Sequence, residues 1–152
     1  FKNYTFRTER SKYLSSLGIP LNTDSTFKGQ LVFAAERSAE LMQEKIITDR
    51  TIIDVMAFCD LSEAMNVEEK NSLNNTLSNL IKEYDVIFYI NDLSIPIEDN
   101  GVRETNETYR VAIDDKIREI ILEHRDKCII MPISGTTEDR VNRIKSVLNN
   151  MY

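Results

Sequence analysis

Glycine, proline, cysteine and histidine are all scarce in this chain of 152 residues. It contains four glycines, three prolines, two cysteines and one histidine. The low glycine and proline content, with 41% hydrophobic and 29% charged residues, is typical of a globular domain and excludes a disordered tail. A chain of this length can form one domain with a proper core.

The few cysteines and the single histidine exclude several kinds of site. Cys59 and Cys128 lie far apart in apolar surroundings, where free cysteines usually act as small core residues. No second cysteine or histidine stands at ligand spacing, so we expect neither a disulfide nor a zinc site. His124 lies in a charged stretch, where we expect a solvated surface position. A Ser-His-Asp triad is therefore hard to build.

The chain also lacks long hydrophobic runs and an excess of positive charge. No apolar run approaches the roughly 20 residues that a membrane-spanning helix needs, and no signal-peptide pattern is present. The formal net charge of −6 disfavours a protein that coats nucleic acid, because phosphate contacts require clustered lysine and arginine. We expect a cytoplasmic protein that binds neither membrane nor nucleic acid.

The most informative stretch runs from Lys45 to Asp54. The apolar pair Ile46-Ile47 ends abruptly in Thr48-Asp49-Arg50, and helical spacing follows at once. This pattern predicts a buried strand that places Asp49 and Arg50 at its carboxyl end, where open α/β sheets bind ligands. The pair could orient a substrate hydroxyl, hold a metal-bound water or cap the next helix, and the sequence leaves these roles open.

Hydrophobic periodicity predicts the other elements. We expect strands near residues 3–6, 85–90 and 128–133, and helices near 27–44, 51–64, 66–84, 107–125 and 137–150. The strand at 85–90 is nearly continuously apolar, which indicates cover on both faces. We expect Asp24 or Ser25 to cap the helix at 27–44, and the last helix to bury Val141, Ile144, Val147 and Leu148.

Alternating strands and helices indicate the fold class. The order predicts a three-layer α/β/α domain with a mostly parallel sheet, and residues 1–152 form this single domain. Gln30 and Arg37 are seven residues apart and share a helix face. This face could point at the strand edge or at solvent, and we expect solvent. The polar segment 95–106 contains the Asn-Gly pair and predicts an exposed loop. Arg103 and Arg110 flank the entry of the next helix, where they could fold over a phosphate or form a solvated loop base.

The order of these features resembles the P-loop kinase-like proteins. This group includes the nicotinamide-riboside kinase domain of bacterial bifunctional NAD enzymes and related phage and bacterial ATP-binding domains of the AAA type. The resemblance covers most of the chain and rests on Gln30, Asp49-Arg50, Tyr84-Asp85-Val86-Ile87-Phe88 and Asp99-Asn100-Gly101-Val102-Arg103. The last segment is the most specific, because the family often carries an Asp-Gly-x-Arg-like lid there, and Asn100 is inserted within or beside it.

The resemblance implies phosphoryl transfer from ATP with Mg²⁺ to a nucleoside, nucleotide or nicotinamide-riboside-like acceptor. Asp49 would be the acceptor-side acid or the ligand of a metal-bound water, with Arg50 as its companion. Arg103 and Arg110 would be the cations of a lid near residues 95–110. The residues implied on the substrate side are Glu9, Arg10, Gln30 and Arg37.

One part of the family pattern is absent from the 152 residues. No G-x-x-x-x-G-K-[ST] occurs, and glycines at positions 18, 29, 101 and 135 cannot assemble one. In the family this phosphate loop follows the first strand, which lies at the centre of the sheet. The resemblance therefore implies that the central strand, phosphate loop and following helix lie outside residues 1–152.

Two other interpretations remain open. The chain could be a noncatalytic interaction or assembly module that lost the phosphate loop and binds a protein partner or a second copy of itself. It could also be a flavodoxin-like or receiver-type signalling domain. The latter predicts an acidic cluster after the first strand, which Tyr4-Thr5-Phe6-Arg7 does not provide.

Overall fold

The computed structural model describes residues 3–8, 10–90 and 107–151. The strands are β1 (Thr5–Arg7), β2 (Ile46–Thr48), β3 (Val86–Ile90) and β4 (Ile129–Ile133). The α-helices are α1 (Ser11–Ser16), α2 (Phe27–Leu41), α3 (Ile52–Asp60), α4 (Val67–Ser78), α5 (Glu107–His124) and α6 (Thr137–Met151), with 3-10 turns η1 (Asn22–Asp24) and η2 (Ile81–Glu83). The predicted α/β class is confirmed.

The described strands form two separate parallel pairs. β1 pairs with β2, so that Thr5 lies beside Ile46 and Arg7 beside Thr48. β3 pairs with β4 from Val86 beside Ile129 to Ile90 beside Ile133. The parallel pairing agrees with the expectation, and the sheet has two halves because no described strand joins β2 to β3.

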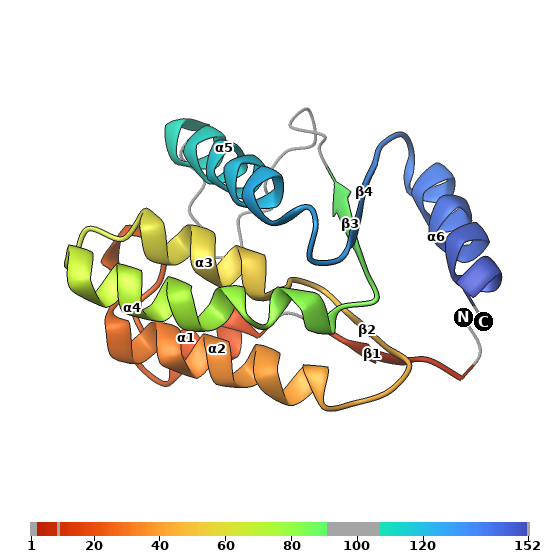
Figure 1. The fold of residues 1–152 in the computed structure, drawn as a ribbon. Helices are drawn as coiled ribbons and strands as arrows, with labels where there is room; N and C mark the ends of the chain where they lie inside the picture. The colour runs from red at the N-terminus through yellow and green to blue at the C-terminus, as the bar shows by residue number, and fades with distance from the viewer. Residues whose placement is uncertain (1–2, 9, 91–106, 152) are drawn as a thin grey trace.

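The core is centred on α3, which packs against α2, α4 and α5. Ile52, Ala57 and Cys59 of this helix have no solvent exposure. Burial raises the pKa of the Cys59 thiol to about 12, so this cysteine is an inert core residue as expected. In Figure 1, α2 to α5 lie on one side of the strands and α6 lies on the other side of β3 and β4. These are the three layers of the fold.

Side-chain caps explain where two of the helices begin. Thr26 starts α2, because its hydroxyl accepts a hydrogen bond from the Gly29 N–H at 3.1 Å. The expectation that Asp24 or Ser25 would cap this helix is wrong. Asn66 and Glu69 form a capping box at α4, with side chain to backbone distances of 2.8 and 3.0 Å.

Burial corrects several expectations about exposed and covered faces. Gln30 and Arg37 are 3% and 5% exposed, so their shared face points into the molecule and not to solvent. His124 is also largely covered, with a side-chain exposure of 16%. β3 is covered less than predicted, because Ile90 at its end is 50% exposed. None of the described helices is long and apolar enough to cross a membrane.

The last helix differs most from the expectation. Val141, Ile144, Val147 and Leu148 are half-buried, and α6 contains no buried residue. The reason is visible in Figure 1, where α6 stands apart from the other helices. One apolar face of α6 therefore lacks the close packing that its spacing predicts.

Candidate functional site

The carboxyl ends of β1 and β2 form a charged edge that positions the Asp49-Arg50 pair. The Asp49 N–H donates to the Arg7 carbonyl at 3.0 Å, which extends the pairing by one residue beyond β2. Arg50 then adopts a left-handed backbone conformation with φ of 90°. The Thr48 hydroxyl donates to the Arg50 carbonyl at 2.8 Å and closes this tight turn. The chain thus leaves the sheet sharply at the predicted pair.

The turn leads directly into a well-capped α3. The Thr51 hydroxyl accepts from the Ile53 N–H at 3.1 Å, and the Asp54 carboxylate accepts from the Thr51 N–H at 2.8 Å. The Tyr84 hydroxyl accepts from the Ile52 N–H at 2.9 Å. These bonds use the first N–H groups of the helix. Because Thr51 and Asp54 form this cap, the interpretation of Asp49-Arg50 as the helix cap is wrong.

Arg50 is held in place by two neighbours on α3. Its Nη1 lies 3.4 Å from the Asp54 carboxylate, and its guanidinium lies 5.5 Å from the centre of the Phe58 ring. Both contacts hold the side chain against α3. Asp49, in contrast, is exposed at the strand end.

A cluster of three arginines and two glutamates supports this edge from α2. Glu36 pairs with Arg7 at 3.0 Å and with Arg10 at 3.2 Å. Glu40 lies 2.8 Å from the Nε of Arg37 and 3.9 Å from the Nε of Arg7. Arg10 also lies over the Tyr13 ring, 4.6 Å from its centre. The cluster ties α2 to β1.

Arg37 and Glu40 form the buried part of this cluster. Their side chains are 6% and 3% exposed, and the Arg37 Nη1 donates to the Asp49 carbonyl at 3.1 Å. The Arg37 Nε and the Glu40 Oε1 are close but are not aligned as a hydrogen bond. Both carboxylate oxygens of Glu40 lack a hydrogen-bond donor. Burial therefore raises the pKa of the Glu40 carboxyl, while the positive charges of Arg37 and Arg7 oppose this rise.

Two cavities meet beside Arg50, Thr51 and Asp54. The smaller, of about 60 Å³, reaches between α2 and α3 to Gln30 and Arg37. The larger, of about 1030 Å³, lies between β2 and β3 and extends to α5 and α6. Asp49 and Arg110 line the larger cavity. The structure thus brings most of the predicted residues that it describes around two cavities that share part of their lining.

Tyr89 of β3 and Asp114 of α5 line the larger cavity and form a second polar cluster with Arg118 of α5. The Tyr89 hydroxyl of β3 donates to the Asp114 carboxylate of α5, and the Arg118 Nη2 lies 2.8 Å from the same carboxylate. Asp114 is 7% exposed. Burial raises the pKa of Tyr89 to about 12, and the hydrogen bond to Asp114 and its negative charge add to this rise. The Tyr89 hydroxyl therefore stays protonated at neutral pH.

The predicted residues fall into three groups. Asp49, Arg50 and Arg110 line the larger cavity, and Gln30 and Arg37 line the smaller one together with Arg50. Arg10 lies beside Glu36 and lines neither cavity. Glu9 and Arg103 are outside the described residues, as is most of the predicted lid at 95–110.

The structure adds functional candidates that the sequence interpretation missed, namely Arg7, Glu36, Glu40, Tyr89 and Asp114. The glutamates Glu36 and Glu40 are four residues apart on α2 and flank Arg37, which is a signal of a shared charged face. That signal does not reveal the partner of the face, because Arg7 comes from a distant strand.

The donor groups fit a metal ion only in part. Within residues 3–8, 10–90 and 107–151, no group of three or more histidine, cysteine, aspartate or glutamate side chains could hold a metal. The Asp54 carboxylate is already engaged by Thr51 and Arg50. Mg²⁺ at phosphoryl-transfer sites is commonly held by one or two carboxylates together with phosphate oxygens and water, and the exposed Asp49 fits such a ligand.

The fold and the charged strand ends define an α/β domain of the kind that binds ligands at the carboxyl edge of parallel strands. A model of the AAA domain family matches residues 23–140. This match covers more than half of the chain, and the chain therefore belongs to this AAA domain family, which is of the P-loop NTPase type. None of the curated proteins matches the chain.

Proposed function

We propose that this domain is part of an ATP-dependent phosphotransferase that acts on a nucleoside, nucleotide or nicotinamide-riboside-like acceptor. The observation that supports this proposal best is the AAA domain match over residues 23–140, which spans the Asp49-Arg50 turn and Arg110. Both flank the cavity of about 1030 Å³, which reaches the upper end of the size range of small-molecule sites.

Asp49 and the arginines provide the charges that phosphoryl transfer needs. We assign Asp49 to the acceptor side, where it accepts the proton of the attacking hydroxyl or holds a water on the metal. Arg50, Arg110 and Arg103 are the cations that neutralise phosphate oxygens. Mg²⁺ bound with ATP supplies charge neutralisation of the β- and γ-phosphates. Because positioning dominates this chemistry, the fixed turn at Arg50 is as important as the charges themselves.

The remaining predicted residues support Asp49 or contact the acceptor. Arg37 donates to the Asp49 carbonyl, so we assign it a positioning role in addition to its predicted place on the substrate side. Gln30 reaches the smaller cavity, where its amide can bind a polar group of the acceptor. Arg10, with Glu9 before it, completes the substrate side. The phosphate cradle of such an enzyme lies outside the 152 residues, because they contain no G-x-x-x-x-G-K-[ST].

Titration of the natural protein with ATP and Mg²⁺, followed by a phosphoryl-transfer assay with nucleosides, tests this proposal. Asp49→Asn should lower the transfer rate by about 100-fold or more, because a positioned acid or base typically contributes this much. The control is Asp126→Asn, an exposed aspartate outside both cavities, which should leave the rate unchanged. An unchanged rate and metal dependence in Asp49→Asn would contradict the assignment.

A noncatalytic interaction or assembly module is the second candidate. The absence of a phosphate-loop motif from the 152 residues favours it. Such a module would bind a protein partner or a second copy of itself and would show no ATP affinity in the natural protein. The same titration separates the two candidates.

A further inference from the structure

The polar and apolar residues of α2 are arranged in the reverse of the usual order for a surface helix. Its buried residues include the polar Gln30, Arg37 and Glu40. A surface helix typically directs polar residues to solvent and apolar residues to the core. After Lys28, however, the exposed residues of α2 and its C-cap are all apolar, namely Leu31, Ala35, Ala39 and Met42. We refer to these four residues as the outer face of α2.

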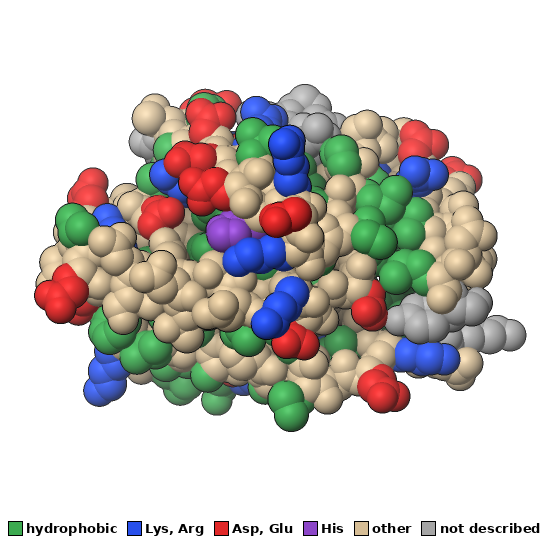
Figure 2. All heavy atoms as spheres, viewed as in Figure 1, with side chains coloured by type: hydrophobic (Ala, Val, Ile, Leu, Met, Phe, Trp, Pro, Cys, Tyr) green, Lys and Arg blue, Asp and Glu red, His purple; other side chains and the backbone are tan. Residues whose placement is uncertain are grey.

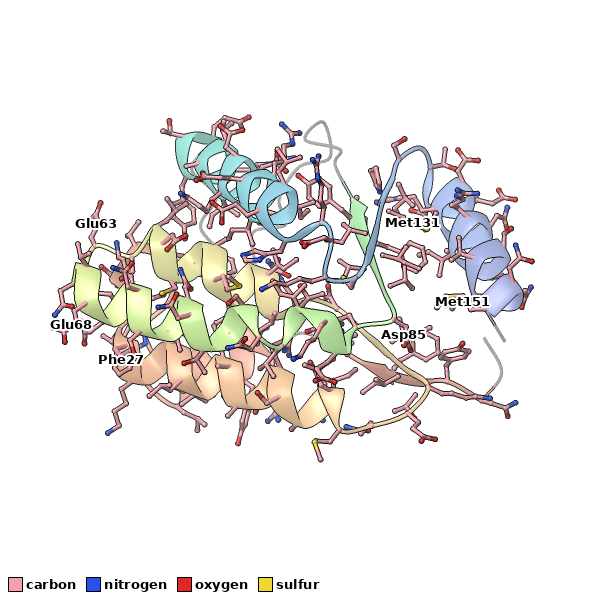
Figure 3. The ribbon with its side chains drawn as sticks, in the orientation of Figure 1. Phe27, Glu63, Glu68, Asp85, Met131 and Met151 are labelled. Carbon is pink, nitrogen blue, oxygen red and sulfur yellow. The ribbon has the colours of Figure 1, made fainter. Side chains whose placement is uncertain are left out.

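The outer face runs along α2 as one continuous line. Leu31 is 45% exposed and Met42 is 85% exposed. Counted from Lys28, the exposed positions follow at intervals of three, four, four and three residues. This spacing matches the 3.5-residue repeat of helices that pack side by side. Figure 2 shows hydrophobic side chains along the lower edge of the molecule, over α2, and Figure 3 shows side chains that extend outward from this helix, which begins at the labelled Phe27.

The outer face is separate from the candidate site. None of its four residues lines either cavity. The site residues Gln30 and Arg37 belong to the opposite, buried face of the same helix. Contiguous exposed apolar surface commonly marks a place where another molecule binds. The phosphotransferase chemistry does not use this surface, so the outer face requires a partner of its own.

The side chains of the outer face are complementary in size to those of a second copy. If two α2 helices pack antiparallel about a twofold axis at Ala35, Leu31 of each copy lies opposite Ala39 of the other. A large side chain then meets a small one on both sides of the axis, which allows close packing. Met42 lies opposite Lys28, whose aliphatic stem can cover it. Such self-complementarity is what a twofold interface requires.

The charges at the two ends of the outer face fit the same arrangement. Lys28 stands near the start of α2, and Glu44 follows two residues after its C-cap. Both residues are exposed. In the antiparallel pair, Lys28 of each copy lies near Glu44 of the other. A parallel pair would instead bring like charges together, which disfavours association. Charge complementarity therefore selects the antiparallel arrangement of two copies.

We propose that the outer face of α2 is an interface with a second copy of this protein, in which the two α2 helices pack antiparallel about a twofold axis near Ala35. α2 has 15 residues and is about 22 Å long. One such helix covers less than the roughly 800 Å² per partner of a standard interface. The dimer is therefore weak, with a dissociation constant in the micromolar range or above. The proposal does not depend on the phosphotransferase function.

Sedimentation velocity of the natural protein at micromolar concentrations tests the proposal. We expect a reversible equilibrium between monomer and dimer. Ala35→Arg places two guanidinium groups together on the axis and should weaken dimerisation about tenfold or more, because like charges across an interface repel each other. Ala35 is exposed, so the variant should fold as the wild type does. The matched control is Ser72→Arg at an exposed position of α4, which should retain the wild-type dissociation constant.

Two results of this experiment would overturn the proposal. A natural protein that stays monomeric at all these concentrations would show that another part of its polypeptide, or solvent alone, covers the outer face. Equal dimerisation of the wild type and Ala35→Arg would show that two copies meet through a different surface.

Exchange of the end charges tests the antiparallel arrangement itself. Lys28→Glu and Glu44→Lys should each weaken dimerisation several-fold, because each substitution places like charges together. The double variant restores opposite charges across the interface and should recover most of the wild-type affinity. Single variants with the wild-type dissociation constant, or a double variant no better than the single ones, would contradict the arrangement.

Discussion

At the scale of single residues, backbone strain and charge burial coincide at the candidate site. Arg50 is a non-glycine residue with φ of 90°, a conformation that costs roughly 1–2 kcal/mol for L-residues. Glu40 is a carboxyl group held in a nearly solvent-free place. Strained and buried groups of this kind are often retained where they serve a function. Arg50 is part of the turn at Asp49, and Glu40 lies beside Arg37, which donates to the Asp49 carbonyl.

Replacing Arg50 separates backbone strain from the function of its side chain. Arg50→Gly and Arg50→Ala both remove the guanidinium, but glycine adopts the left-handed conformation without strain. We expect the glycine variant to have a free energy of unfolding about 1 kcal/mol above that of the alanine variant. Urea unfolding measures this difference. Both variants should lose phosphoryl transfer equally, and equal stabilities would show that the turn carries no strain.

Glu40 predicts a specific dependence of stability on pH. Because its pKa is raised in the folded state, its contribution is present below the ordinary pKa of 4.5 and is lost as pH rises through the raised value. Relative to the wild type, Glu40→Gln should therefore become more stable as pH rises through this range. Unfolding free energies from pH 4 to 7 measure the effect. A stability difference that does not vary with pH would show that the Glu40 pKa is unshifted.

At the scale of elements, the cap of α3 links the charged edge to the core. Thr51 and Asp54 begin the helix, and Ile52, the first helical residue, is completely buried. The Tyr84 hydroxyl reaches this residue from the segment before β3. A loss of the cap therefore affects both the site and the most buried helix.

The Thr51 hydroxyl provides a direct test of that link. Thr51→Ala should lower the free energy of unfolding by about 1 kcal/mol, because the Ile53 N–H loses its acceptor. Thr51→Ser retains the hydroxyl and should lose much less. Urea unfolding of the two variants at one pH gives the comparison. If serine and alanine destabilise equally, the cap hydrogen bond is not what stabilises the start of α3.

At the scale of the whole molecule, stability is unevenly distributed. α3 contributes six buried residues, whereas α6 contributes none and lies apart from the other helices (Figure 1). Elements with few buried apolar contacts open at low free energy. In the 152-residue chain we expect the α6 amides to exchange well before those of α3. Similar rates in the two helices would contradict this distribution.

Hydrophobic periodicity predicted the helices and strands well, because it depends only on residues that are close together in the sequence. The helix at 107–125 and the strand at 128–133 differ from α5 and β4 by a single residue at one end. The face of Gln30 and Arg37 was predicted wrongly, because a charged residue at helical spacing usually faces solvent. Here the buried positive charge is compensated by Glu40 and the Asp49 carbonyl.

The sequence by itself determined the α/β class, the order of the elements and the place of Asp49-Arg50 at a strand end, since these depend on local spacing. Tertiary structure alone decided that Arg7, Arg10 and Arg37 share Glu36 and Glu40, and that β2 and β3 border one cavity. The physical reason is that ion pairs and strand neighbours depend on which distant segments of the chain come into contact. Hydrophobic periodicity reports only the spacing of residues within one segment, so it does not predict these contacts.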